Sequence, residues 1–141
     1  MIVKEYLSQA YMLDQRINAH LEEVKRLRDM ATGLSSPTLG DKVQTPRDNN
    51  APFVKSVEKI ILLENKINAE IDTLVALKEQ IHDVISTVED QNESLILQYR
   101  YIQGQSWESI AAAMHADISS AYRWHTNALR HVKMPENPIL I

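Results

Sequence analysis

The sequence predicts an all-α protein in which a long antiparallel helical hairpin, similar to a coiled coil, precedes a C-terminal helix-turn-helix unit. Apolar residues recur every seven positions in two long stretches, a segment rich in Pro and Gly separates these stretches, and the last third of the chain divides into short amphipathic segments. These three observations predict a hairpin and oligomerisation region over 1–91, a helix-turn-helix domain over 92–134 and a tail over 135–141.

The first arm of the hairpin is expected over about 3–32. One row of apolar residues at seven-residue spacing consists of Val3, Ala10, Ile17, Val24 and Ala31. A second row contains Tyr6, Leu13 and Leu27, and His20 interrupts it. Both rows lie on one face of a helix, so this arm must bury its stripe against another helix to be stable.

The second arm is expected over about 54–90, with the same seven-residue repeat. Its first row consists of Ile60, Ile67, Leu74, Ile81 and Val88. Its second row contains Leu63, Leu77 and Val84, and Glu70 interrupts it. The intervening segment 33–53 contains three prolines and two glycines, which predict a flexible linker because Pro disfavours helical geometry at the residue before it. Two arms of similar length joined by one linker favour an antiparallel hairpin.

The apolar stripes are wider than a strict two-row seam. Leu7 and Leu21 widen the stripe of the first arm, and Ile71 and Ile85 widen that of the second. A two-helix hairpin would leave part of this width exposed. We therefore expect a homo-oligomer in which arms from two or more chains pack together.

The segment after the hairpin contains the signals that begin and end short helices. Gly104 predicts the end of one helix near Gln103, Ser106 predicts the N-cap of a second helix, and Asp117 predicts the N-cap of a third. The acidic cluster Glu89, Asp90 and Glu93 is interpreted as a polar hinge in which Asp90 or Asn92 caps the next helix, with contact to a basic partner as the alternative.

These short helices are expected to share one core. The second should bury one face consisting of Ile110, Ala111 and Met114. The third should bury Ala121, Trp124, Ala128 and Val132, and Trp107 is also assigned to the core. The opposite side of the third helix carries side chains that can hydrogen-bond to base edges or phosphates. These candidate DNA-binding residues are Ser119, Ser120, Tyr122, Arg123, Thr126, Asn127 and Arg130.

The C-terminal segment resembles region 4 of sigma-70-type transcription factors. With the preceding helical pattern, the chain is similar to the ArpU-like group of small phage-encoded regulators of late transcription. The matching residues are Ile96, Leu97, Arg100, Tyr101, Gly104, Ser106 to Ala111, Met114, Arg123, Ala128 and Leu129. The resemblance implies that the helix from Ile118 enters the major groove of double-stranded DNA and that host RNA polymerase is a partner.

Two features depart from the family pattern. His115 stands where the family usually has Gly, and a positive φ there would cost about 1 kcal/mol, so we expect the turn to be built differently. Ser119 and Ser120 are less charged than the corresponding residues of many family members, which makes Arg123 the main expected base-reading residue.

The charge is distributed unevenly. The chain has a net charge of −4, but residues 54–99 contain 4 basic and 9 acidic residues, whereas residues 100–141 contain 4 basic and 3 acidic residues. Phosphate neutralisation supplies most non-specific DNA affinity. A local charge this small predicts modest affinity for a single subunit and reliance on oligomerisation or a partner protein.

Other classes of protein are not favoured. There is no Cys and no pair of His on one helical turn, so no metal site is predicted, and enzyme signatures such as a phosphate-binding Gly loop or a Ser elbow are missing from the sequence. We expect no cofactor. No apolar run is long enough for a membrane span or signal peptide, so the expected location is the cytoplasm of a bacterial host.

Three interpretations stay open. The first is a sequence-specific transcription regulator of phage origin that acts on late or structural gene expression. The second is a DNA-packaging protein similar to the small subunit of a phage terminase, which also combines DNA-binding helices with an oligomerising helical region. The third is a coiled-coil adaptor whose C-terminal unit binds protein.

Overall fold

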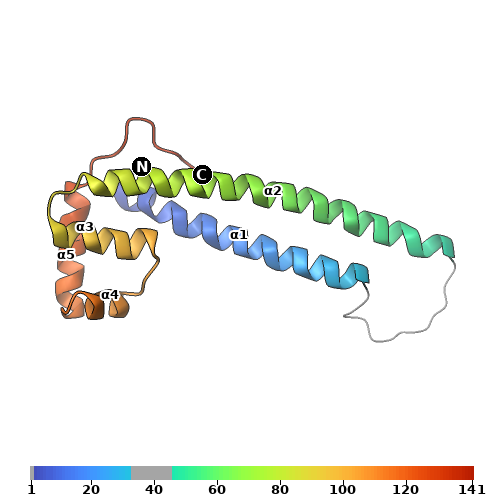
Figure 1. Ribbon diagram of the computed structural model, residues 1–141, viewed down its shortest axis with the longest axis horizontal. Coiled ribbons are helices and arrows are strands. Elements are labelled where there is room, and N and C mark those ends of the chain that lie inside the picture. The colour runs from blue at the N-terminus through green and yellow to red at the C-terminus, as the bar shows by residue number, and fades with distance from the viewer. Residues whose placement is uncertain (1, 33–45) are drawn as a thin grey trace. The chain divides into compact units, whose positions relative to one another are not determined.

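The chain is all-helical in the computed structural model, which describes residues 2–32 and 46–141 and, for residues 46–52, the backbone alone. Its elements are α1 (Val3–Thr32), α2 (Pro46–Ser86), α3 (Gln91–Leu97), the π-helical turn η1 (Gln98–Ile102), α4 (Trp107–Ala113) and α5 (Ile118–His131) (Figure 1). The described residues contain no strand, which confirms the all-α part of the predicted fold class. Over these same ranges, no helix combines the length and apolar character that a membrane span requires.

Helix α2 differs from the predicted second arm at both ends. It begins at Pro46 rather than near residue 54, and it ends at Ser86 rather than near residue 90. Pro is compatible with the first helical position, because the N–H groups of the first turn have no acceptor within the helix. The predicted linker 33–53 was therefore wrong for residues 46–53, and its remainder, 33–45, lies outside the described residues.

The chain forms two compact units that divide it at other points than the sequence predicted. One unit consists of residues 1–14 and 73–141, and the other of residues 15–72. In the first unit, Tyr6 and Leu7 from α1 share one core with Ile96 and Leu97 from α3. The ends of the two long helices therefore belong to the same unit as the C-terminal helices.

The core of the first unit is made of fully or nearly fully buried apolar side chains. Its buried members are Tyr6, Leu7, Ala10, Leu77, Ile81, Val84, Ile85, Val88, Ile96, Leu97, Tyr101, Ile110, Ala111, Ala121, Ala128 and Val132. Leu7 and Ile85, which widen the predicted stripes, are both buried here. In this unit, the residues that widen the stripes are therefore buried by contacts within a single chain.

In the unit of residues 15–72, the two polar interruptions of the apolar rows contact each other. Nδ1 of His20 lies 2.7 Å from Oε1 of Glu70, and Arg16 lies 4.0 Å from the other carboxylate oxygen of Glu70. A second ion pair joins Arg28 to Glu64. Because a polar group at a seam costs least when it meets a polar partner, the His20–Glu70 pair favours one register of α1 against α2 in this unit.

The segment predicted as a tail, 135–141, is part of the first unit and is hydrogen-bonded to both long helices within it. The side chain of Gln9 donates to the carbonyl of Ile139 at 2.8 Å and accepts from the N–H of Ile141 at 3.0 Å. Gln80 donates to the carbonyl of Asn137 at 3.0 Å, and its Oε1 accepts from the N–H of Ile139 at 2.9 Å and from the Tyr6 hydroxyl at 2.6 Å. Two amide side chains therefore satisfy successive backbone groups of residues 137–141.

The predicted helix caps are confirmed. Asp90, Ser106 and Asp117 each accept a hydrogen bond from a backbone N–H three residues ahead, at 3.0, 3.2 and 2.8 Å respectively. Gly104 has a φ of 66°, as its place after the first short helix predicts. Each cap satisfies a backbone donor that the first helical turn leaves without a partner.

The turn between α4 and α5 contains a strained residue. His115 has a φ of 53°, so the expectation that this turn would avoid a positive φ was wrong. The N–H of Ala116 donates to the carbonyl of Ala111 at 2.9 Å, and this hydrogen bond closes the turn at the end of α4. The capping hydrogen bonds on both sides of His115 thus hold it in a conformation that is usually left to Gly or Asn.

We expect His115→Val to lower the free energy of unfolding by about 1 kcal/mol, because a β-branched side chain fits the left-handed region worse than His does. His115→Gly removes the Cβ clash and should not destabilise the protein. Urea denaturation followed by circular dichroism compares the three chains. Equal stability of the Val and Gly variants would contradict the assignment of strain to this residue.

Candidate nucleic-acid interface

Helix α5 exposes a polar face opposite the face that it buries. Ala121, His125 and Ala128 are buried, whereas Ser119, Tyr122, Arg123, Thr126 and Arg130 are exposed. The exposed set follows the spacing i, i+3, i+4, i+7 and i+11, which places its members on one side of a helix of 3.6 residues per turn. Ser120 and Asn127 are half-buried and border this face. All seven candidate DNA-binding residues are therefore on one helix with at least part of their surface accessible.

The side chains of this face differ in how many hydrogen bonds they can still form with a ligand. The hydroxyl of Thr126 donates to the carbonyl of Tyr122 at 3.1 Å, so Thr126 retains only its acceptor capacity for a ligand. The ring of Tyr122 is 49% exposed and contacts the edge of Trp107, with 5.0 Å between ring centroids. Arg123 and Arg130 are the two cations of the face.

The N-terminal end of α5 is acidic because Asp117 caps it. Hydrogen bonds from the side chain and the backbone of Ser120 lower the pKa of the Asp117 carboxyl, and the positive charge of Arg123 lowers it further. Asp117 is therefore ionised at neutral pH and offsets part of the charge of Arg123. The electrostatic attraction of this face for phosphate is modest, in line with the weak local charge of the sequence.

A ring-stacked network lies behind the exposed face. The Tyr101 hydroxyl is 2.7 Å from Nε2 of His125, and the ring of His125 packs edge-on against Trp107 at 4.8 Å between centroids. The guanidinium of Arg100 lies over the Trp107 ring at 4.9 Å and donates to the carbonyl of Gln105 at 3.0 Å. These contacts join η1, α4 and α5 and hold α5 in a fixed position.

Part of this network was not predicted from the sequence. His125 is not among the residues that the sequence predicts to be buried, yet it is only 8% exposed. Trp107 and Trp124, which were assigned to the core, are only partly buried at its edge. The buried small residues Ala121 and Ala128 allow α5 to approach its neighbours closely, so the bulky Trp side chains lie at the periphery. His125 lies four residues after Ala121 and three before Ala128, so helical spacing was the signal that could have placed it on the buried face.

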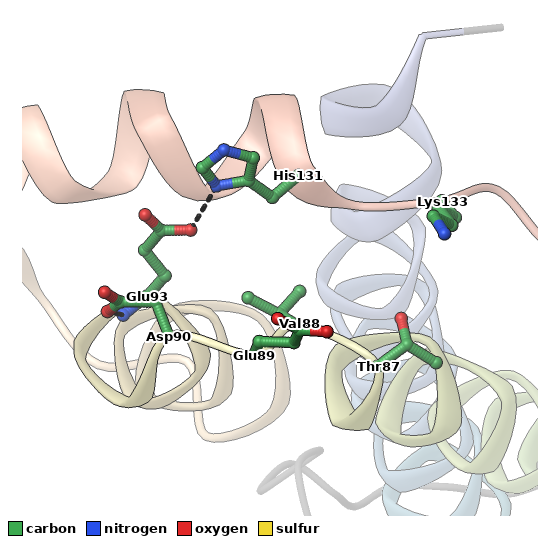
Figure 2. Close-up of a pocket in the computed structure, with 7 residues that line it drawn as sticks. All are labelled: Thr87, Val88, Glu89, Asp90, Glu93, His131 and Lys133. Carbon is green, nitrogen blue, oxygen red and sulfur yellow. Dashed lines mark hydrogen bonds and ion pairs between the residues drawn. The ribbon is translucent and has the colours of Figure 1, made fainter.

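A hollow in the first unit is acidic. It has a volume of about 520 Å³ and is lined by Thr87, Val88, Glu89, Asp90, Glu93, His131 and Lys133. Figure 2 shows Glu93 reaching from α3 toward His131 at the end of α5, with 2.6 Å between Oε1 and Nδ1. Three carboxylates against one Lys make this hollow a poor site for phosphate.

The described residues offer no metal site. Within residues 2–32 and 46–141, no three His, Asp or Glu side chains gather at a distance that could hold an ion. Glu93 and His131 are paired with each other, and Asp90 is used as the N-cap of α3. The polar face of α5 is therefore the candidate functional surface of these residues.

Comparison with known proteins gives one match. Residues 11–133 match the model of a family described as "Protein of unknown function (DUF722)". No curated protein and no solved structure matches the chain. The family model covers most of α1, all of α2, the three short C-terminal helices and the turn between α4 and α5. Since the match extends over most of the sequence, the chain belongs to the DUF722 family.

Proposed function

We propose that this protein is a sequence-specific DNA-binding transcription regulator of phage origin, acting on late or structural gene expression. In this proposal α4 and α5 form a helix-turn-helix similar to sigma region 4, and α5 enters the major groove. The observation that carries the proposal is the face of α5, where five exposed polar or aromatic side chains lie opposite a buried side of Ala121, His125 and Ala128. A helix with one fixed side and one exposed hydrogen-bonding side is what major-groove recognition requires.

The turn before α5 supports the same proposal. Asp117 caps α5, and the left-handed His115 reverses the chain between α4 and α5 within a few residues. The Tyr101–His125–Trp107 contacts fix the orientation of α5 from behind. A recognition helix must be held rigidly, because base-edge hydrogen bonds depend on the positions of a few side chains.

The long helices have a supporting role in the proposal. We propose that α1 and α2 form an antiparallel hairpin that assembles the protein into a homo-oligomer, so that several modest DNA-binding faces act together. The pairs His20–Glu70 and Arg28–Glu64 support this direction, because a later residue of α1 meets an earlier residue of α2. Host RNA polymerase is the proposed protein partner.

The first test measures DNA binding by a variant of the main base-reading candidate. A duplex is selected from a random library by the unaltered protein, and its affinity is then compared with that of Arg123→Ala. We expect a loss of about 1 to 3 kcal/mol if Arg123 contacts a guanine. Arg26→Ala, which removes an exposed Arg from α1, is the matched control and should bind nearly as the unaltered protein does. Equal affinities for the Arg123 variant and the control would remove Arg123 from the interface.

The second test separates regulation from packaging. Cell-free transcription from late promoters of the phage that encodes the protein is measured with and without the protein. The proposal predicts a change in transcript level that is lost with Arg123→Ala. DNA binding without any effect on transcription would favour the terminase-like interpretation, and no binding to any duplex would favour the coiled-coil adaptor.

A further inference from the structure

Helix α2 carries a second apolar seam that its contacts with α1 do not cover. Ile61 is 52% exposed and Ile71 is 40% exposed, whereas the neighbouring Ile60 and Ile67 are buried. Ile61 and Asn68 are seven residues apart, and so are Glu64 and Ile71, so the four side chains occupy the two alternating seam positions of a coiled coil. In the sequence, the same register continues to Val54 and Val57.

A groove accompanies this seam in the unit of residues 15–72. It has a volume of about 400 Å³ and is lined by Leu21, Val24, Ile61, Glu64, Asn65, Ile67, Asn68 and Ile71. Leu21, on α1, is 48% exposed at its edge. The groove thus combines five apolar side chains with three polar ones, Glu64, Asn65 and Asn68, which suits a second helix better than a small ligand.

The residues of the seam are placed symmetrically about Lys66, so the seam can pair with an antiparallel copy of itself. Ile61 and Ile71 lie five residues before and after Lys66, and Glu64 and Asn68 lie two residues before and after it. Val57 and Val75 are also equally distant from Lys66 in the sequence. In a two-fold symmetric contact, residue i meets residue j and residue j meets residue i. An antiparallel second copy of α2 therefore pairs Ile with Ile and Glu with Asn.

The polar pair selects this orientation over the parallel one. In a parallel pair, Glu64 would face Glu64 of the second copy, and like charges at an interface are unfavourable. In the antiparallel pair, the amide of Asn68 can donate to the carboxylate of Glu64 on the other copy, twice by symmetry. Glu64 is already ion-paired with Arg28 of its own chain, so this carboxylate keeps a cation beside it when it is covered.

We propose that the Ile61–Glu64–Asn68–Ile71 seam of α2 binds the same seam of a second copy in antiparallel orientation, forming a symmetric homodimer. Leu21 of each copy flanks the contact and is covered by it. This interface does not depend on the DNA-binding face of α5, because its residues lie between positions 21 and 71 of the chain. Loss of DNA binding by Arg123→Ala would leave the dimer intact.

The association is tested by sedimentation of matched variants. Ile71→Asp places one charge in the seam of each copy. It should raise the dimer dissociation constant by about 100-fold or more. Leu62→Asp is the control, because Leu62 is 69% exposed but lies outside the seam. Circular dichroism verifies that both variants stay helical. A monomeric unaltered protein at micromolar concentration, or equal weakening by both variants, would overturn the proposal.

The orientation is tested by disulfide trapping, which the chain permits because it contains no Cys. Ile61→Cys and Ile71→Cys chains of different mass are mixed and oxidised. In the antiparallel pair the mixture should give a crosslinked heterodimer, while Ile61→Cys alone should not crosslink, because its two copies are separated by roughly 15 Å along the axis. Efficient crosslinking of Ile61→Cys alone would show a parallel pair and overturn the proposed register.

Discussion

Replacing Ile96 with Ala should lower the free energy of unfolding by about 2 to 5 kcal/mol, as measured by urea denaturation. Ile96 is on α3, is fully buried and belongs to the cluster that joins α3 to both long helices and to α5. Truncation leaves a cavity in a core that several elements share, so the surroundings cannot collapse into it without moving a helix. The whole first unit should unfold at lower urea concentration.

Leu95→Ala is the matched control for this variant. Leu95 precedes Ile96 on the same helix but is 39% exposed, so its truncation should cost clearly less. The sequence alone would have placed the largest effect at Trp124, with a cost of about 3 to 5 kcal/mol on truncation to Ala. Trp124 is only half-buried, so we now expect Trp124→Ala to cost less than Ile96→Ala. The opposite order of the two costs would contradict the packing described for this core.

Lowering the pH from 7 to 4 should remove about 3 kcal/mol of stability through His125 alone. Burial, together with the positive charges of Lys4 and Arg100, lowers the pKa of His125 from 6.5 to about 4. The unfolded chain then binds a proton near pH 6.5 that the folded chain does not accept until about pH 4. The stabilisation is therefore complete above pH 6.5 and is lost as the pH falls through this range.

The contact between Tyr101 and His125 adds a second reason, after burial, why protonation is unfavourable in the folded state. Burial raises the pKa of Tyr101 to about 12, so its hydroxyl stays protonated beside Nε2 of His125. A protonated imidazole has no acceptor nitrogen, so the Tyr101 hydroxyl could only accept from Nε2–H, and its own proton would need another acceptor.

Unfolding free energies of the unaltered protein, His125→Gln and His82→Gln are to be measured between pH 7 and 4. The decline should be smaller in His125→Gln, which has no imidazole to protonate, and unchanged in His82→Gln, where an exposed His is replaced. Identical slopes for all three chains would show that His125 does not control the acid response.

Structural features that depend on residues close together in the sequence could be predicted from the sequence. The all-α class follows from the seven-residue repeats, and the caps at Asp90, Ser106 and Asp117 follow from single side chains that reach a backbone N–H three residues ahead. One local prediction was wrong: the low propensity of His for a positive φ predicted a different turn at His115, but its φ is positive. Capping hydrogen bonds on both sides of that residue outweighed a local cost of about 1 kcal/mol.

Features that depend on distant pairs were not predictable in the same way. The sequence showed His20 and Glu70 as separate interruptions of two apolar rows, and only the fold brought their side chains to 2.7 Å. It also gave no sign that Gln9 and Gln80 would hold residues 137–141, because amide side chains carry no periodic signal.

The sequence by itself determined that this protein is helical, where its short C-terminal helices begin, and which residues of α5 share a polar face, because each of these depends on contacts within about one or two helical turns. Only the tertiary structure decided that His125 is buried while Trp124 is not, and that the ends of α1 and α2 share a core with α3 and α5. Those outcomes depend on which faces meet across the chain, and a side chain's burial is set by the partner that covers it.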